Sequence, residues 1–393
     1  MDTRTVTESR TLEAAPAAVA RAIASPHGLA VWYCDDARSD RRPDGTLALG
    51  WNEGARWYGR WTAFEPERLA WRLRDDVSGA EGTVAFALAP EGDGTRVEVT
   101  AVAPAGEAEG VAARWREALA DLAAYVTTGA NARFLRRPML GIDVDVFTPE
   151  QAAARGYPVS RGIRLGDVTA DGAAAAAGLA KGDIVVGLGG NEVTGWPSLV
   201  AALAAHRAGE TVEVSAWRGD ERLELPVTLK ARERQAQAES PEALAAAVTE
   251  TTDDLVTRLS GALDGLTDAQ AARKPGGEEW SVKEVLAHLV LSERYGHDSL
   301  TRLAADDAAP TWPERAEPLY QAALVGLPLD DLRSLLVSDL RLTEAIIVAA
   351  LADAPPPVFH ELAGTVAFAP IHWDDHLAQV AALRAGAPEA VPV

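Results

Sequence analysis

The spacing of apolar residues predicts three successive units of different architecture. Residues 3–12 alternate polar and apolar positions, as a strand with one buried face does. A short helix beginning at Pro16 and several further alternating runs follow. The stretch closes with a helix whose apolar residues recur every three or four positions, namely Val111, Trp115, Leu119, Leu122 and Val126. This order predicts an α+β domain over residues 1–130, with a sheet wrapped on a long helix.

The remaining periodicities change from strands to helices. Residues 136–232 contain alternating strands and one helix near 197–206, and residues 233–239 are expected to form a linker. Helical spacing then predicts four helices over residues 240–388. Ser240 and Ser281 are expected to cap the first two. The third is predicted over 329–352, and the fourth is predicted to begin near Pro370 and to end near 385.

Charge and cysteine content exclude several classes of function. The 393 residues carry a formal net charge of -21, which argues against nucleic acid or an anionic membrane as a partner. The single cysteine, Cys34, excludes an internal disulfide framework and a Cys-x-x-Cys motif. The N-terminus has no apolar secretion signal, and no run of about 18 apolar residues is present. We therefore expect a soluble, cytoplasmic protein.

Three histidines are the strongest candidate for chemistry. His372 and His376 are four residues apart and so share one helix face, and His288 lies in the amphipathic segment 281–303. If the two helices pack together, three imidazoles converge on a site for one divalent transition metal, with zinc or nickel favoured. The alternative is three core histidines, each with its own hydrogen-bond partner. No general base is evident beside them.

Other polar residues near the histidines are ambiguous. Asp374 and Asp375 either orient a ligand imidazole or lie on the helix surface, with the surface favoured. His297 and His360 are expected at the surface.

Four segments of the first domain, 15–26, 57–71, 94–99 and 114–122, resemble the helix-grip SRPBCC (START-like) superfamily. The most similar branch is that of the activator-of-heat-shock-ATPase homologues. The resemblance implies a cavity for a small apolar ligand between the sheet and the long helix. Its candidate lining residues are Trp57, Trp61, Trp71 and Trp115, which alternatively form only the core.

The runs Met-Leu-Gly-Ile-Asp-Val (139–144) and Ala-Gly-Leu-Ala-Lys-Gly-Asp-Ile-Val (177–185) resemble a PDZ domain of the circularly permuted, bacterial HtrA-like type. The resemblance implies a groove that binds a protein C-terminus or an internal peptide by strand addition. The matching positions are Leu140, Gly141 and Ile142 in the carboxylate-binding loop, Arg137 or Arg136 as the upstream basic residue, and Ser198 in the groove. The acidic residues Asp143 and Asp145, and the lack of a protease triad, leave a non-binding spacer as the alternative.

Residues 278–289 and 372–380 resemble the DinB-like superfamily of four-helix bundles. The resemblance implies a divalent metal held by His288, His372 and His376. Related bundles include thiol-dependent isomerases, thiol transferases and hydrolases.

Together these patterns predict a multidomain α+β protein. It comprises a helix-grip domain (1–130), a β-rich, partly open PDZ barrel (136–232) and an all-α four-helix bundle (240–388). The favoured function is that of a bacterial binding protein with an apolar-ligand cavity, a peptide groove and a metal site. The alternative is a metal-dependent enzyme, a thiol-dependent transferase or isomerase or a hydrolase, whose other domains capture substrate or partner.

Overall fold

The computed structural model describes residues 2–52, 54–145, 147–232, 238–276, 280–307 and 317–385. The chain forms two compact units, residues 1–234 and 235–393. Residues 233–237 of the expected linker and the predicted bundle end at 386–388 lie outside the described residues. Within the described ranges, no helix combines the length and the apolarity needed to cross a bilayer.

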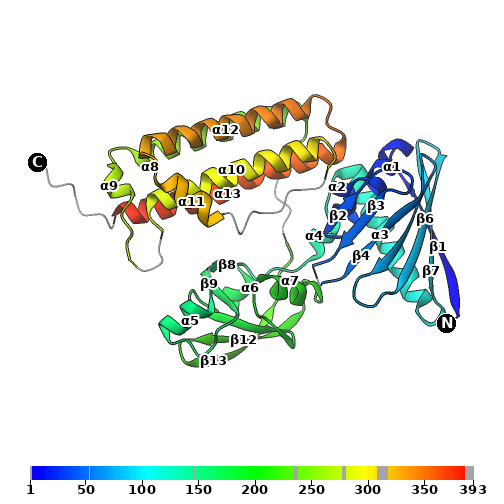
Figure 1. Cartoon of the computed structure of the whole chain (residues 1–393), viewed down its shortest axis with the longest axis horizontal. Coiled ribbons are helices and arrows are strands. Elements are labelled where there is room, and N and C mark those ends of the chain that lie inside the picture. Colours follow the sequence, from blue (N-terminus) through cyan, green and yellow to red (C-terminus); the bar gives the residue numbers. More distant parts are fainter. Residues whose placement is uncertain are drawn as a thin grey trace, which may run out of the picture. The chain divides into compact units, whose positions relative to one another are not determined.

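The N-terminal part is an antiparallel sheet around a long helix (Figure 1). The seven strands are ordered β1-β7-β6-β5-β4-β3-β2, so the sheet is open. The helix α3 (Ala108–Thr128) packs on β1 and β7, and Gly129 ends it in a left-handed conformation. The other elements are β1 (Thr3–Leu12), α1 (Pro16–Ala24), α2 (Pro26–Trp32), β2 (Asp36–Ser39), β3 (Thr46–Gly50), β4 (Arg56–Glu65), β5 (Arg68–Asp75), β6 (Glu81–Glu91), β7 (Gly94–Pro104), η1 (Ala105–Glu107) and α4 (Ala132–Arg136).

The second part of this unit is a β-rich fold in which β8 (Ile142–Asp145) forms one edge. Its strands are ordered β13-β12-β10-β9-β8, and β11 pairs with β10. The remaining elements are α5 (Pro149–Arg155), β9 (Ile163–Val168), α6 (Ala173–Ala176), β10 (Ile184–Leu188), β11 (Asn191–Glu192), α7 (Trp196–Ala204), β12 (Thr211–Arg218) and β13 (Glu221–Thr228). The free edge of β8 matters for the groove considered below.

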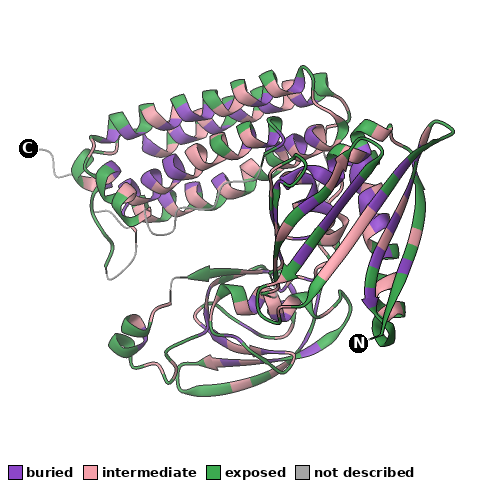
Figure 2. Cartoon of the chain, turned by 45° about the vertical axis from the view of Figure 1, so that its right-hand side comes forward, coloured by how far each residue is buried: buried purple, intermediate pink, exposed green. Residues whose placement is uncertain are grey.

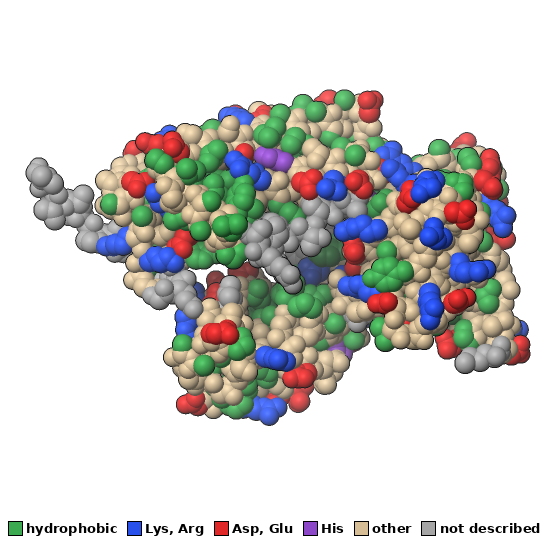
Figure 3. Space-filling view, viewed as in Figure 1, with side chains coloured by type: hydrophobic (Ala, Val, Ile, Leu, Met, Phe, Trp, Pro, Cys, Tyr) green, Lys and Arg blue, Asp and Glu red, His purple; other side chains and the backbone are tan. Residues whose placement is uncertain are grey.

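Over its described residues the C-terminal unit is a bundle of four long helices with two short ones, and acidic and basic side chains both lie on its surface (Figure 3). The long helices are α8 (Pro241–Leu263), α10 (Val282–Ala304), α12 (Leu329–Leu351) and α13 (Pro356–Ala385), and the short ones are α9 (Asp268–Ala271) and α11 (Glu317–Val325). Ser240 and Ser281 cap α8 and α10 as predicted. The buried residues of each long helix face the other helices (Figure 2), because their apolar positions follow the helical period.

The predicted start of the last helix near Pro370 is wrong. The helix α13 already begins at Pro356, and Pro370 lies inside it. Proline is tolerated in the first turn, where its missing N–H costs no hydrogen bond, so the proline run begins this helix. The added turns bury Val358, Leu362 and Val366 in the bundle core, which offsets the loss of a helical hydrogen bond at Pro370.

Candidate functional site

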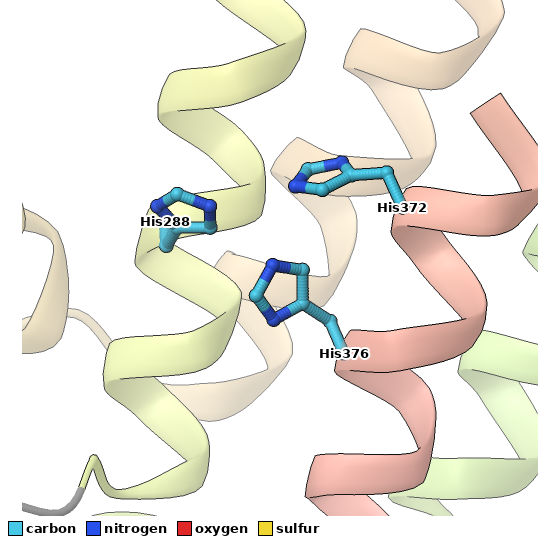
Figure 4. Close-up of side chains that lie close together, drawn as sticks. All are labelled: His288, His372 and His376. Atoms are coloured by element: carbon cyan, nitrogen blue, oxygen red, sulfur yellow. The ribbon is translucent and has the colours of Figure 1, made fainter. Parts of the chain in front are cut away.

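The three predicted histidines converge inside the bundle. His288 projects from α10, and His372 and His376 project from successive turns of α13 (Figure 4). The ring centroid of His376 lies 4.8 Å from that of His288 and 4.7 Å from that of His372. One ligand nitrogen from each ring lies within 4.8 Å of the other two. This separation allows a single ion to contact all three rings once they turn toward it.

Burial keeps these imidazoles in the state that a metal requires. Desolvation, followed by the neighbouring His376, lowers the pKa of His288 from 6.5 to about 4. Desolvation, together with His376 and His288, lowers the pKa of His372 to about 4. Burial also lowers the pKa of His376. At neutral pH all three rings are therefore uncharged, so each keeps one nitrogen lone pair for coordination.

An aromatic side chain forms one wall of the site. The Trp280 ring lies 5.2 Å from that of His288, and it stacks on His376 at 6.4 Å with an interplanar angle of 15°. Trp373, which follows His372, is fully buried and donates its indole N–H to Glu293 Oε1 at 3.0 Å. The Trp280 indole covers part of the His288 and His376 rings, which is consistent with the lowered pKa values of these residues.

Beside the three histidines lie two oxygen-bearing side chains that the sequence analysis did not identify. Glu317 Oε1, at the start of α11, is 3.6 Å from His288 Nδ1. Gln379 Oε1 is 3.2 Å from His376 Nδ1. Gln379 is three residues beyond His376 on one helix, so helical spacing was a usable signal for it. Glu317 is far from His288 in the sequence, and no local pattern indicated it.

The other polar candidates have structural roles. Asp374 forms an ion pair with Arg258 of α8 at the surface, and Asp375 is exposed, as favoured above. The expectation that His297 and His360 are surface residues is wrong, because both are half-buried. His297 Nε2 lies 3.0 Å from both the Asp339 carbonyl oxygen and Thr343 Oγ1, so α12 holds it inside the bundle.

The N-terminal fold has an aromatic-lined pocket that includes three of the four predicted tryptophans. Trp57, Trp71 and Trp115 line it, together with Trp32, Tyr33 and Trp51. Trp61 does not line it: its ring packs edge-on against Phe64 and Trp71, and its indole N–H donates to Ser39 Oγ at 3.1 Å. The Tyr33 ring stacks on Trp115 at 5.1 Å, so aromatic rings also fill part of the space under the sheet.

The basic residues predicted to serve the carboxylate-binding loop are engaged elsewhere. Arg137 forms an ion pair with Asp35, a side chain that is only 9% exposed. Arg136 donates to both carboxylate oxygens of Asp121, each at 2.6 Å. Both carboxylates belong to the N-terminal fold and require a counter-charge because they are buried. Arg137 therefore already has a carboxylate partner, and a role for it beside a bound peptide stays a prediction.

The loop that precedes β8 requires glycine at position 141, and its role in binding a carboxylate stays a prediction. Gly141 adopts φ +73°, and a Cβ built on it would lie 2.8 Å from Gly172 Cα, so this position requires glycine. Leu140 is buried in the core, and Ile142 begins the edge strand β8. Ser198, predicted to line the groove, instead accepts the backbone N–H groups of Thr194 and Gly195. Its hydroxyl therefore caps the N-terminus of α7.

Three known families match the chain in the predicted order. Residues 13–127 match the family described as activator of Hsp90 ATPase homolog 1-like protein, residues 138–229 match the PDZ domain, and residues 251–380 match the DinB superfamily. The chain joins an AHSA1-like, a PDZ and a DinB domain. Each family covers less than half of the chain.

Individual relatives are similar over single parts of the chain. The zinc metalloprotease RasP of Geobacillus kaustophilus (strain HTA426) is 34% identical over 83 residues, which are 21% of this chain and 19% of that protein. Among solved structures, CalU16 of Micromonospora echinospora is 24% identical, with a TM-score of 0.28 over 32% of this chain and 77% of its own. The Aha1 dimer of Colwellia psychrerythraea is 17% identical, with a TM-score of 0.29 over 31% and 95%.

Proposed function

We propose that this chain is a multidomain binding protein whose DinB domain holds one divalent transition-metal ion, zinc or nickel, on His288, His372 and His376. The supporting observation is the convergence of three neutral imidazoles from two helices, with ligand nitrogens within 4.8 Å of one another. Imidazole nitrogen is the donor that both metals accept. When bound, such an ion acts as a Lewis acid and lowers the pKa of a coordinated water to about 7.

The other two domains support binding roles of different kinds. The aromatic pocket of the AHSA1-like domain suits a small apolar ligand, because its wall offers large apolar ring surfaces. The PDZ domain offers the free edge of β8 beside a glycine loop, which suits the addition of a peptide strand. A bacterial origin and a cytoplasmic location remain predictions, and cell fractionation tests the second.

A specific observation favours the alternative that the bundle is a metal-dependent enzyme. Among the described residues three histidines would hold the ion, and a tetrahedral ion with three protein ligands would keep a fourth position for water or a thiolate, as in catalytic zinc sites. A thiolate or a water at that position would serve a thiol-dependent transferase or isomerase, or a hydrolase. A screen of the metal-loaded chain with low-molecular-weight thiols and electrophiles, and with hydrolase substrates, tests this. No turnover with either set would exclude both reaction types for the compounds used.

Metal analysis of the purified full chain tests the metal site. We expect about one zinc or nickel ion per chain, and we expect the His372→Ala variant to lose it. His360→Ala is the matched control, since it removes an imidazole from the same helix outside the triad. Equal metal content in His372→Ala and the wild type would refute the site, whereas loss in both variants would indicate damage to α13.

A further inference from the structure

The carboxylate of Glu317 lies against one of the three histidines. The helix α11 (Glu317–Val325) packs on α10, and this places Glu317 Oε1 3.6 Å from His288 Nδ1. The two side chains are 25% and 18% exposed, so bulk water screens their interaction only in part. Gln321, one turn further along α11, donates its amide to Glu317 Oε1 at 3.3 Å. The carboxylate is thus held on the side of the ring where Nδ1 lies.

This carboxylate favours one of the two tautomers of His288 through its charge, since 3.6 Å is longer than a hydrogen bond. A neutral imidazole has one N–H and one lone pair, while a carboxylate only accepts hydrogen bonds. The negative charge facing Nδ1 therefore favours a proton on Nδ1 over a lone pair there, which leaves the lone pair on Nε2. In this structure Nε2 lies 3.4 Å from Ser292 Oγ, a hydroxyl that can donate to a lone pair and rotate away when the nitrogen binds an ion.

A second histidine of the triad has the same arrangement. His376 Nδ1 lies 3.2 Å from Gln379 Oε1, an oxygen that accepts a hydrogen bond. Two histidines from different helices therefore each have an oxygen acceptor beside Nδ1. Both rings are then left with Nε2 as the nitrogen that can coordinate an ion, which gives the site one consistent tautomer at these two positions.

We propose that Glu317 is a positioning residue for the metal site: when an ion is bound, its carboxylate would accept a hydrogen bond from Nδ1–H of His288 and leave Nε2 as the ligand nitrogen. This inference rests on the proposed metal site and extends it to a residue on α11, a third helix beside α10 and α13. The negative charge of Glu317 also makes the His288 ring a stronger donor, as carboxylates do behind metal-bound histidines.

Zinc affinity measured by chelator competition on the full-length chain tests the proposal. We expect Glu317→Ala to weaken zinc binding by about 10- to 100-fold. Glu317→Gln should recover part of this loss, because its amide oxygen can still accept a hydrogen bond from Nδ1–H. Glu344→Ala is the matched control, since Glu344 is 18% exposed in the same bundle but is bonded to Arg341 and Thr249. This control should bind zinc as the wild type does.

Nitrogen NMR of the histidine rings supplies a readout that a loss of packing alone would not change. In the zinc-loaded wild type, His288 should show a protonated Nδ1 and a metal-bound Nε2. Coordination of zinc by His288 Nδ1, or unchanged affinity in Glu317→Ala, would overturn the role of Glu317 alone. Loss of one oxygen ligand in X-ray absorption spectra of Glu317→Ala would show direct ligation and also overturn it. A wild-type chain that binds no zinc or nickel would instead overturn the metal site itself.

Discussion

The lowered pKa values of the triad predict that the metal-free bundle loses stability in mild acid. In an unfolded chain the histidines accept protons as the pH falls through about 6.5. In the folded chain His288 and His372 stay neutral until a pH of about 4. Between these values the unfolded state binds more protons, so the free energy of unfolding decreases as the pH falls. Above a pH of about 6.5 the histidines are mostly neutral in both states, so their protonation no longer changes the free energy of unfolding.

The magnitude follows from the size of the pKa shift. A fall in pKa from 6.5 to about 4 for His288 corresponds to a loss of about 3 kcal/mol at pH values below 4. At pH 5 the same shift costs about 2 kcal/mol, because the unfolded imidazole is almost fully protonated there. His372 shows a similar shift, but the two histidines interact, so their contributions overlap rather than add.

Urea unfolding of the chelator-treated full chain, followed by far-UV circular dichroism, measures this loss. The comparison is with a variant in which His288, His372 and His376 are all glutamine, which does not titrate. Between pH 7.5 and pH 5 the wild type should lose about 2 kcal/mol more than this variant in the transition of the helical unit. Equal losses in the two proteins would refute the reasoning, since they would show that the triad is not kept neutral by burial.

Three further predictions concern packing, a buried charge and the peptide groove. Leu336→Ala, at a fully buried position of α12, should lower the free energy of unfolding by about 2–5 kcal/mol in the same urea assay. Its control is Leu342→Ala, on the same helix but 47% exposed, which should change the free energy of unfolding by less than about 0.5 kcal/mol. Arg136→Ala should destabilise the N-terminal fold by about 1–3 kcal/mol in tryptophan-monitored unfolding, because it leaves the buried Asp121 carboxylate without its partner. The loss is limited because Arg136 itself is half-exposed and water screens the pair. No change would show that water replaces the guanidinium. A library of C-terminal peptides should yield binders with Kd below about 100 μM, and Gly141→Ala, at φ +73°, should abolish their binding; a library without binders would make the PDZ domain a spacer.

Local patterns predicted most of the helices and strands because their causes lie in neighbouring residues. Ser240 and Ser281 cap helices through hydrogen bonds to residues three positions away, so sequence alone sufficed. The start of α13 was missed because a run of prolines ends helices as readily as it begins them. Only the packing of the following turns against the core decides between the two.

Some residues of the candidate site follow from local spacing, whereas others depend on how distant segments pack. His372 and His376 share a face by helical spacing, and the amphipathic pattern of residues 281–303 indicated His288 before the family resemblance did. Glu317 was missed because its approach to His288 depends on how α11 packs on α10. The ion pair of Arg137 with Asp35 joins residues that are distant in the sequence, so no spacing rule could indicate it.

An anomalous-difference map of a zinc-loaded crystal shows whether the three histidines hold the ion. We expect one strong zinc peak per bundle, at about 2.0–2.1 Å from one ring nitrogen of each of His288, His372 and His376. Zinc bound at another site, or a bundle without a peak between α10 and α13 under saturating zinc, would contradict this expectation.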